Sequence, residues 1–128
     1  MKLLLDTHTF IWWDSQPANL SGAATAALSD PSNSLILSTA SVWEMAVKVD
    51  LGKLTLRLPL AQIVSHQQTT NGLVVLPVTL PHVLELERLP RPHRDPFDRM
   101  LIAQAISEGA ILVSADPVFS SYPVHVLW

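Results

Sequence analysis

Short apolar runs recur along the chain and constrain its fold more than any other feature. The first run, Leu3-Leu4-Leu5, is followed directly by the acidic residue Asp6. An apolar run of this length, bounded by polar residues, is typical of a strand buried on both faces, as in a parallel sheet. Runs of this kind predict strands at residues 3–5, 35–37, 73–78, 111–113 and 124–127.

The segments between these runs carry helix signals. Ser21 and Ser38 stand where an N-cap is expected, and Gly52, Gly72 and Gly109 follow the last residues of predicted helices. The predicted helices cover residues 9–13, 21–28, 40–49, 59–69, 79–89 and 97–108. Residues 53–58 are ambiguous, and residues 90–96 are predicted to form a loop rich in Pro and Arg. Alternating strands and helices predict an α/β fold with a mostly parallel sheet.

Length and composition exclude several classes of protein. The chain has 128 residues, 48% of them hydrophobic, and is expected to form a single domain over residues 1–128 with a real core. It has no cysteine, which excludes a disulfide framework and a thiolate metal site and fits a cytoplasmic location. No apolar run approaches the roughly 20 residues of a membrane span, and the first is cut too short for a signal peptide. The net charge of −3 does not indicate a nucleic-acid binder, although a local basic patch or a metal ion can do that electrostatic work.

Four acidic residues fall at related positions in this predicted fold. Asp6 ends the first strand, and Asp116 comes just after the fourth. Glu44 lies early in the helix after the second strand, and Asp98 lies in the first turn of the helix before the fourth. In open α/β sheets, ligands bind beyond the carboxyl ends of the strands, so these acids are expected at one edge. Clustered carboxylates repel one another, which implies a hard divalent cation such as Mg²⁺. Such ions activate water for phosphodiester hydrolysis.

Each acid also has a purely structural interpretation. Asp6 and Asp116 can cap the helices that follow them. Glu44 precedes Lys48 by four residues, a spacing that suits a surface ion pair. Asp98 can favour the positive end of its helix. Taken singly these signals are weak, and they gain force from their order along the chain.

In that order and with these neighbours, the residues resemble the PIN-domain ribonucleases, in particular the VapC-type toxins of bacterial toxin–antitoxin pairs. The matching segments are residues 3–7, 40–45, 98–105 and 112–119, and the resemblance extends over essentially the whole chain. It implies a PIN-like three-layer α/β/α fold with a central, mostly parallel sheet of four to five strands. It also implies a Mg²⁺- or Mn²⁺-dependent endoribonuclease that acts on tRNA, rRNA or mRNA. A homodimer and a cognate antitoxin that covers the site are implied as well.

The resemblance also assigns roles to individual residues. Ser114 matches a hydroxyl position that orients the fourth acid or a metal-bound water, and Thr7 has a supporting role through its hydroxyl or backbone. Asp95 lies three residues before Asp98, and we prefer Asp98 as the ligand while Asp95 remains a supporting or alternate one. The four acids matched to catalysis and metal binding are Asp6, Glu44, Asp98 and Asp116.

Basic residues concentrate in one segment of the chain. Four of the five arginines lie within residues 88–99, beside Asp95 and Asp98. Arginine pairs well with phosphate, so Arg91, Arg94 and Arg99 are predicted to guide the RNA backbone. The alternative is a solvated loop whose arginines pair with local acids. A histidine and three tryptophans near the predicted site are expected to have structural or docking roles rather than catalytic ones. They are His8, Trp12, Trp13 and Trp43.

Two other functions compete with the nuclease. A phosphatase that forms an aspartyl-phosphate needs a second acid two residues after the first, and His8 occupies that position. A phospho-acceptor signalling module, or an inactive partner-binding domain, would also suit an acidic Mg²⁺-binding pocket. A phospho-acceptor module normally has a Lys at a late strand end, and no Lys follows Lys53.

Overall fold

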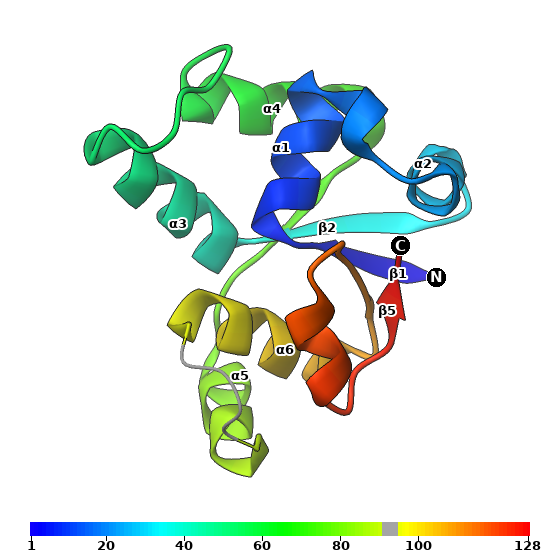
Figure 1. Ribbon diagram of the computed structural model, residues 1–128, viewed down its shortest axis with the longest axis vertical. Helices are drawn as coiled ribbons and strands as arrows, with labels where there is room; N and C mark the ends of the chain where they lie inside the picture. The colour runs from blue at the N-terminus through cyan, green and yellow to red at the C-terminus, as the bar shows by residue number, and fades with distance from the viewer. Residues whose placement is uncertain (91–94) are drawn as a thin grey trace.

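The central sheet is parallel throughout. The computed structural model describes residues 1–90 and 95–128, and within them five strands form one sheet in the order β3-β2-β1-β4-β5 (Figure 1). Every neighbouring pair runs parallel, so all the carboxyl ends lie at one edge. This confirms the predicted sheet of four to five strands. The strands are β1 (Lys2–Leu5), β2 (Ser34–Ser38), β3 (Val74–Leu76), β4 (Ile111–Val113) and β5 (Val126–Leu127).

Helices connect the strands and cover both faces of the sheet. Figure 1 shows α1, α2 and α4 on one side, with α6 and then α5 on the other. The α-helices are α1 (Thr7–Ser15), α2 (Gly22–Ser29), α3 (Thr39–Asp50), α4 (Leu60–Asn71), α5 (Leu80–Glu85) and α6 (Pro96–Glu108). Short 3₁₀ helices occur at η1 (Pro17–Asn19), η2 (Leu86–Arg88) and η3 (Pro117–Ser121).

The buried apolar residues explain this three-layer arrangement. Side chains alternate along a strand, so Leu3 and Leu5 face one layer of helices while Leu4 faces the other. Leu3 and Leu5 pack with Phe10 of α1 and Met45 of α3, whereas Leu4 packs with residues of α6. The strand is therefore apolar from Leu3 to Leu5, because each of its faces meets a helix layer.

Predicted boundaries agree with the structure where a cap or a proline decides them. Ser21 and Ser38 accept backbone hydrogen bonds at the starts of α2 and α3. Gly72 and Gly109 end α4 and α6 with positive φ angles of 66° and 63°. The strand predicted at 73–78 stops at Leu76, just before Pro77, and it lies at the sheet edge. The last strand is shorter than predicted, and the connection before it contains η3.

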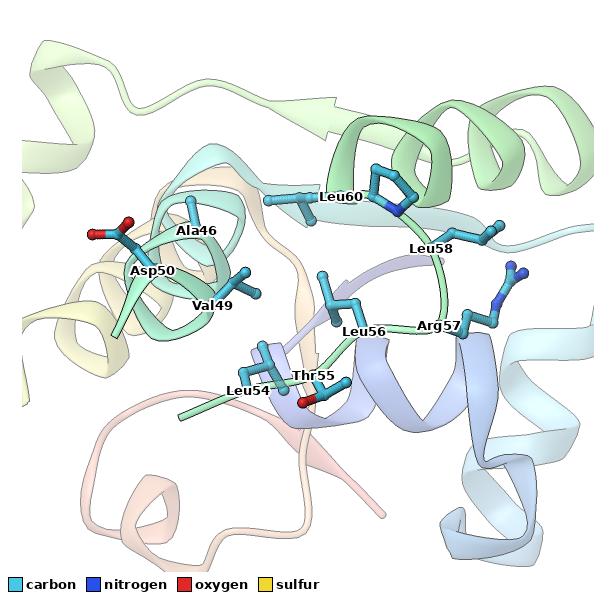
Figure 2. Close-up of a pocket in the computed structure, with 10 residues that line it drawn as sticks. Ala46, Val49, Asp50, Leu54, Thr55, Leu56, Arg57, Leu58 and Leu60 are labelled. Atoms are coloured by element: carbon cyan, nitrogen blue, oxygen red, sulfur yellow. The ribbon is translucent and has the colours of Figure 1, made fainter. Parts of the chain in front are cut away.

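The ambiguous segment between α3 and α4 forms an irregular connector. It lies against an open hollow of about 680 Å³, whose lining includes Leu54, Leu56 and Val49 (Figure 2). The Arg57 guanidinium donates two hydrogen bonds of 2.8 and 2.9 Å to the carboxylate of Asp14, at the end of α1. This pairing raises the pKa of Arg57 above its usual value and ties the connector to the first helix.

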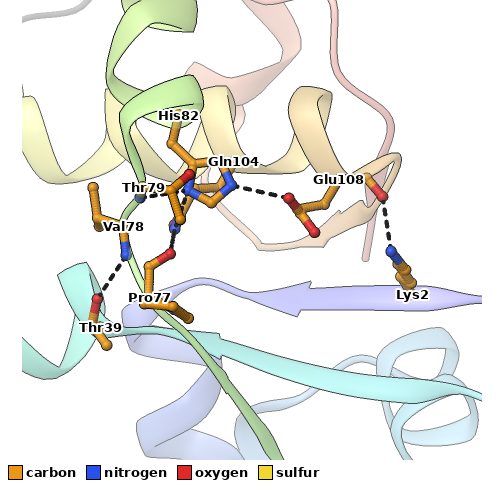
Figure 3. A network of polar contacts seen from close by, with 8 residues as sticks. All are labelled: Lys2, Thr39, Pro77, Val78, Thr79, His82, Gln104 and Glu108. Atoms are coloured by element: carbon orange, nitrogen blue, oxygen red, sulfur yellow. Dashed lines mark hydrogen bonds and ion pairs between the residues drawn. The ribbon is translucent and has the colours of Figure 1, made fainter.

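A buried polar network fastens α5 to α6 on the opposite side of the sheet (Figure 3). The Thr79 N–H donates to Nδ1 of the buried His82 at 3.0 Å. Because Nδ1 accepts this bond, the neutral ring carries its proton on Nε2, which lies 3.0 Å from Oε2 of Glu108. The Gln104 amide also reaches His82 Nδ1, at 3.3 Å. Within the described residues, no helix is long and apolar enough to cross a membrane.

Candidate active site

Two of the four predicted acids meet at the carboxyl edge of the sheet. Asp6 follows β1 and Asp116 follows β4, and these strands are neighbours. The hydroxyl of Ser114 donates to Oδ2 of Asp6. The same hydroxyl oxygen accepts the backbone N–H of Asp116 at 3.0 Å. Ser114 therefore links the carboxylate of Asp6 to the backbone of Asp116.

The structural interpretation of these two acids is confirmed, because each caps the helix that follows it. Oδ1 of Asp6 caps α1 by accepting the Thr9 N–H at 2.7 Å. Oδ1 of Asp116 caps η3 by accepting the Val118 N–H at 3.0 Å. Asp6 is only 6% exposed, and burying its charge costs free energy. The hydrogen bonds from the Thr9 N–H and the Ser114 hydroxyl offset that cost. A capping role and a ligand role do not exclude each other, because a carboxylate offers about four lone-pair positions.

Glu44 lies on the buried face of α3 and is 5% exposed. Its Oε1 accepts a hydrogen bond of 2.6 Å from the hydroxyl of Thr7, the residue directly after Asp6. Its Oε2 lies 2.8 Å from Nζ of Lys48, one helical turn along. The ion pair that the spacing suggested is present, but its carboxylate is inside the protein rather than on the surface. Thr7 therefore places Glu44 beside the end of β1.

The two acids at the start of α6 have different positions. Asp95 is the N-cap, and its Oδ1 accepts the N–H groups of Phe97 and Asp98 at 2.8 and 3.3 Å. Asp98 lies half-buried in the first turn of the helix. Helices α3 and α6 touch near this point, where the rings of Trp43 and Phe97 meet edge-on with centroids 5.0 Å apart. The helices that carry Glu44 and Asp98 are thus neighbours.

A cavity of about 240 Å³ opens beside the first pair of acids. It is lined by Asp6, His8, Trp12, Ala115 and Asp116. The exposed His8 imidazole lies against the Trp12 indole, with ring centroids 6.0 Å apart. Sequence reasoning gave His8 and Trp12 little weight, because neither a lone His nor an aromatic residue signals a cavity wall by itself.

Thr9 was missed by the sequence analysis. It is fully buried, and its hydroxyl donates a 2.9 Å hydrogen bond to the Val113 carbonyl at the end of β4. Together with its N–H bond to Asp6, this contact fixes the start of α1 between β1 and β4. Its position three residues after an N-cap was the available signal.

The predicted basic patch divides into different environments. Arg91 and Arg94 lie outside the described residues. Arg99 reaches inward, and its guanidinium donates to the Pro90 and Leu86 carbonyls at 2.7 and 3.4 Å. It also donates to the Tyr122 hydroxyl at 3.3 Å. Arg88 lies 4.0 Å from Glu85, the kind of local pairing that the alternative interpretation expected.

The donor atoms of the predicted site fit a hard divalent cation by their chemistry. Asp6, Glu44, Asp98 and Asp116 offer carboxylate oxygens and Ser114 a hydroxyl, the oxygen ligands that Mg²⁺ and Mn²⁺ prefer. In residues 1–90 and 95–128, no three acidic or histidine side chains converge closely enough to hold one ion between them. Asp6 and Glu44 each accept hydrogen bonds from the protein's own donors. The class defined by these features is a parallel α/β domain with a carboxylate site at the carboxyl edge of its sheet.

Comparison with known proteins identifies the family. Residues 3–124 match the PIN domain. The chain is 31% identical over 121 residues to Ribonuclease VapC22 of Mycobacterium tuberculosis, covering 89% of this chain and 86% of that protein. The chain therefore belongs to the PIN domain family.

Solved structures share the fold. VapBC2 from Rickettsia felis, bound to a promoter DNA fragment, matches with a TM-score of 0.75 and 14% identity, over 98% of this chain and 97% of that one. FitAcB from Neisseria gonorrhoeae matches with a TM-score of 0.62 and 18% identity, over 97% and 95% of the two chains. VapBC-1 from nontypeable Haemophilus influenzae also gives 0.62, with 15% identity over 98% and 96%.

Proposed function

We propose that this protein is a metal-dependent endoribonuclease, the toxin of a toxin–antitoxin pair. Membership of the PIN family and the 31% identity to a protein named Ribonuclease VapC22 support this function. The structural observation that carries it is the burial of Asp6 and Glu44 beside the carboxyl edge of the sheet. Asp6 directly follows β1, and the hydroxyl of the next residue, Thr7, binds the carboxylate of Glu44, so both carboxylates lie near the same end of β1. Asp116 lines the same cavity as Asp6.

The proposed ligands of the ion, Mg²⁺ or Mn²⁺, are Asp6, Glu44, Asp98 and Asp116. A bound divalent ion supplies an activated water and stabilises the leaving oxygen in phosphodiester hydrolysis. The chain's own residues set the geometry. Ser114 holds Oδ2 of Asp6 and the backbone of Asp116, while Thr7 holds Oε1 of Glu44. Asp95 supports Asp98 by capping its helix, which leaves Asp98 as the preferred ligand of the two.

The proposed substrate is RNA, cleaved to 5′-phosphate and 3′-hydroxyl ends in the cytoplasm. Arg91 and Arg94 are proposed to guide its backbone, whereas the internal contacts of Arg99 favour a structural role for that residue. The proposed protein partners are a cognate antitoxin and a second copy of the chain. The solved VapBC structures support the antitoxin, because they are toxin–antitoxin complexes in which the matching chain has the fold of this protein.

An RNA digestion tests the activity. Wild-type protein, Asp6→Asn and the control Asp50→Asn are each incubated with tRNA, rRNA and mRNA in Mg²⁺, Mn²⁺ or EDTA. Asp50 is exposed at the end of α3, so its substitution removes one carboxylate charge away from the site. We expect cleavage by wild type and Asp50→Asn in either metal, none in EDTA, and a loss of at least about 100-fold in Asp6→Asn. Folded wild-type protein that cuts no RNA class would instead favour the signalling or partner-binding alternative.

A further inference from the structure

Lys48 brings a positive charge to a carboxylate that is otherwise buried. Its Nζ lies 2.8 Å from Oε2 of Glu44, and its own side chain is 36% exposed. The other oxygen of Glu44 is held by the neutral Thr7 hydroxyl. Within the described residues, the Lys48 ammonium is therefore the cation that balances this buried negative charge.

A bound divalent ion would need the same carboxylate. An ion that approaches Glu44 must either displace the ammonium from Oε2 or bind with a like charge close by. Both routes oppose binding of the ion. Lys48 can leave without unfolding the helix, because its Nζ is at the end of a flexible stem that already reaches solvent.

We propose that Lys48 is an internal counter-cation that weakens the affinity of this site for divalent ions. In the metal-free protein it satisfies Glu44 and stabilises the fold, and it yields that oxygen when the ion binds. Lys48 is thus a positioning residue whose charge sets the ion concentration at which the site becomes loaded. This inference rests on the proposed function, since it takes Glu44 as an ion ligand.

Calorimetric titration with Mn²⁺ and with Mg²⁺ tests the proposal on the folded chain. Lys48→Met keeps the length of the side chain and removes its charge. We expect its Kd for Mn²⁺ to be about tenfold lower than that of wild type, which corresponds to about 1.4 kcal/mol. Because Lys48 is partly exposed, the ratio should shrink between 0.05 and 0.5 M salt.

Two further variants separate charge from shape and position. Lys48→Arg retains the positive charge and should bind Mn²⁺ no more tightly than wild type. Lys53→Met removes a charge from an exposed lysine just beyond the same helix, and it should leave the Kd within about twofold. Thermal unfolding in EDTA gives a readout that needs no ion. Lys48→Met should melt below wild type there, and Mn²⁺ should raise its melting temperature by more than it raises that of wild type.

The outcomes distinguish this inference from the function on which it rests. Equal or weaker Mn²⁺ binding by folded Lys48→Met, with normal binding by wild type, would overturn the role of Lys48 alone. Absence of Mn²⁺ and Mg²⁺ binding in both proteins would overturn the metal site as well. Tighter binding that does not depend on salt would also count against it, because an electrostatic effect at a partly exposed group must be screened.

Discussion

Replacement of Thr7 by valine tests whether its hydroxyl holds Glu44 in place. The hydroxyl donates to Oε1 at 2.6 Å, and both residues are buried. A hydrogen bond to a charged group contributes about 1.5–3 kcal/mol. Valine has the same shape and returns about 0.8 kcal/mol through its added methyl group. Lys48 still holds Oε2, so the loss stays limited to one bond, and we expect a net cost of about 1.5 kcal/mol.

Denaturant and thermal unfolding in EDTA measure this cost. For a chain of this length, about 1.5 kcal/mol corresponds to a fall of roughly 6 °C in the melting temperature. Thr25→Val is the matched control, since Thr25 is exposed on α2 and its substitution should change stability by less than about 0.5 kcal/mol. A Thr7→Val protein as stable as the control would refute the reasoning, because it would mean that Glu44 needs no donor at Oε1.

Further predictions concern residues away from the carboxylates. Arg99→Met should lower stability by about 1–2 kcal/mol, because its guanidinium serves three internal acceptors. Arg88→Met should change stability little, since Arg88 is 81% exposed. If Arg99→Met reduced the dependence of RNA affinity on salt concentration, that result would contradict the internal role of Arg99. His82→Ala should cost about 3 kcal/mol in chemical denaturation, because it opens a cavity and leaves the Thr79 N–H without its acceptor. A loss below about 1 kcal/mol would show that water replaces the ring.

The layout of the fold was predictable because its signals are local. Three leucines in a row at residues 3–5 are typical of a strand with helices on both sides, and the two faces of β1 indeed meet different cores. Ser21, Ser38 and Gly109 mark helix ends through hydrogen bonds and a backbone angle that depend on a few neighbouring residues. The sheet order was not predicted, because pairing between strands 100 residues apart leaves no local pattern.

The candidate site was predictable only in outline. The positions of Asp6 and Asp116 after neighbouring strands follow from the α/β layout. Spacing alone did not reveal that Glu44 is buried, because four residues to Lys48 suits a surface pair and an internal pair equally. The direction of the Arg99 side chain was equally hidden, since its acceptors come from residues 86, 90 and 122.

The same side chains stabilise the two buried carboxylates of the site. A buried carboxylate is costly unless donors surround it, and here each receives two: Thr9 and Ser114 serve Asp6, while Thr7 and Lys48 serve Glu44. Three of these four donors are neutral hydroxyl or backbone groups, which orient an oxygen without opposing a cation. The ammonium of Lys48 is different, because its charge must be displaced or tolerated when an ion arrives. The electrostatic balance of the site therefore depends on the Glu44–Lys48 pair. The single substitution Lys48→Met changes the charge of this pair and leaves the surrounding fold in place.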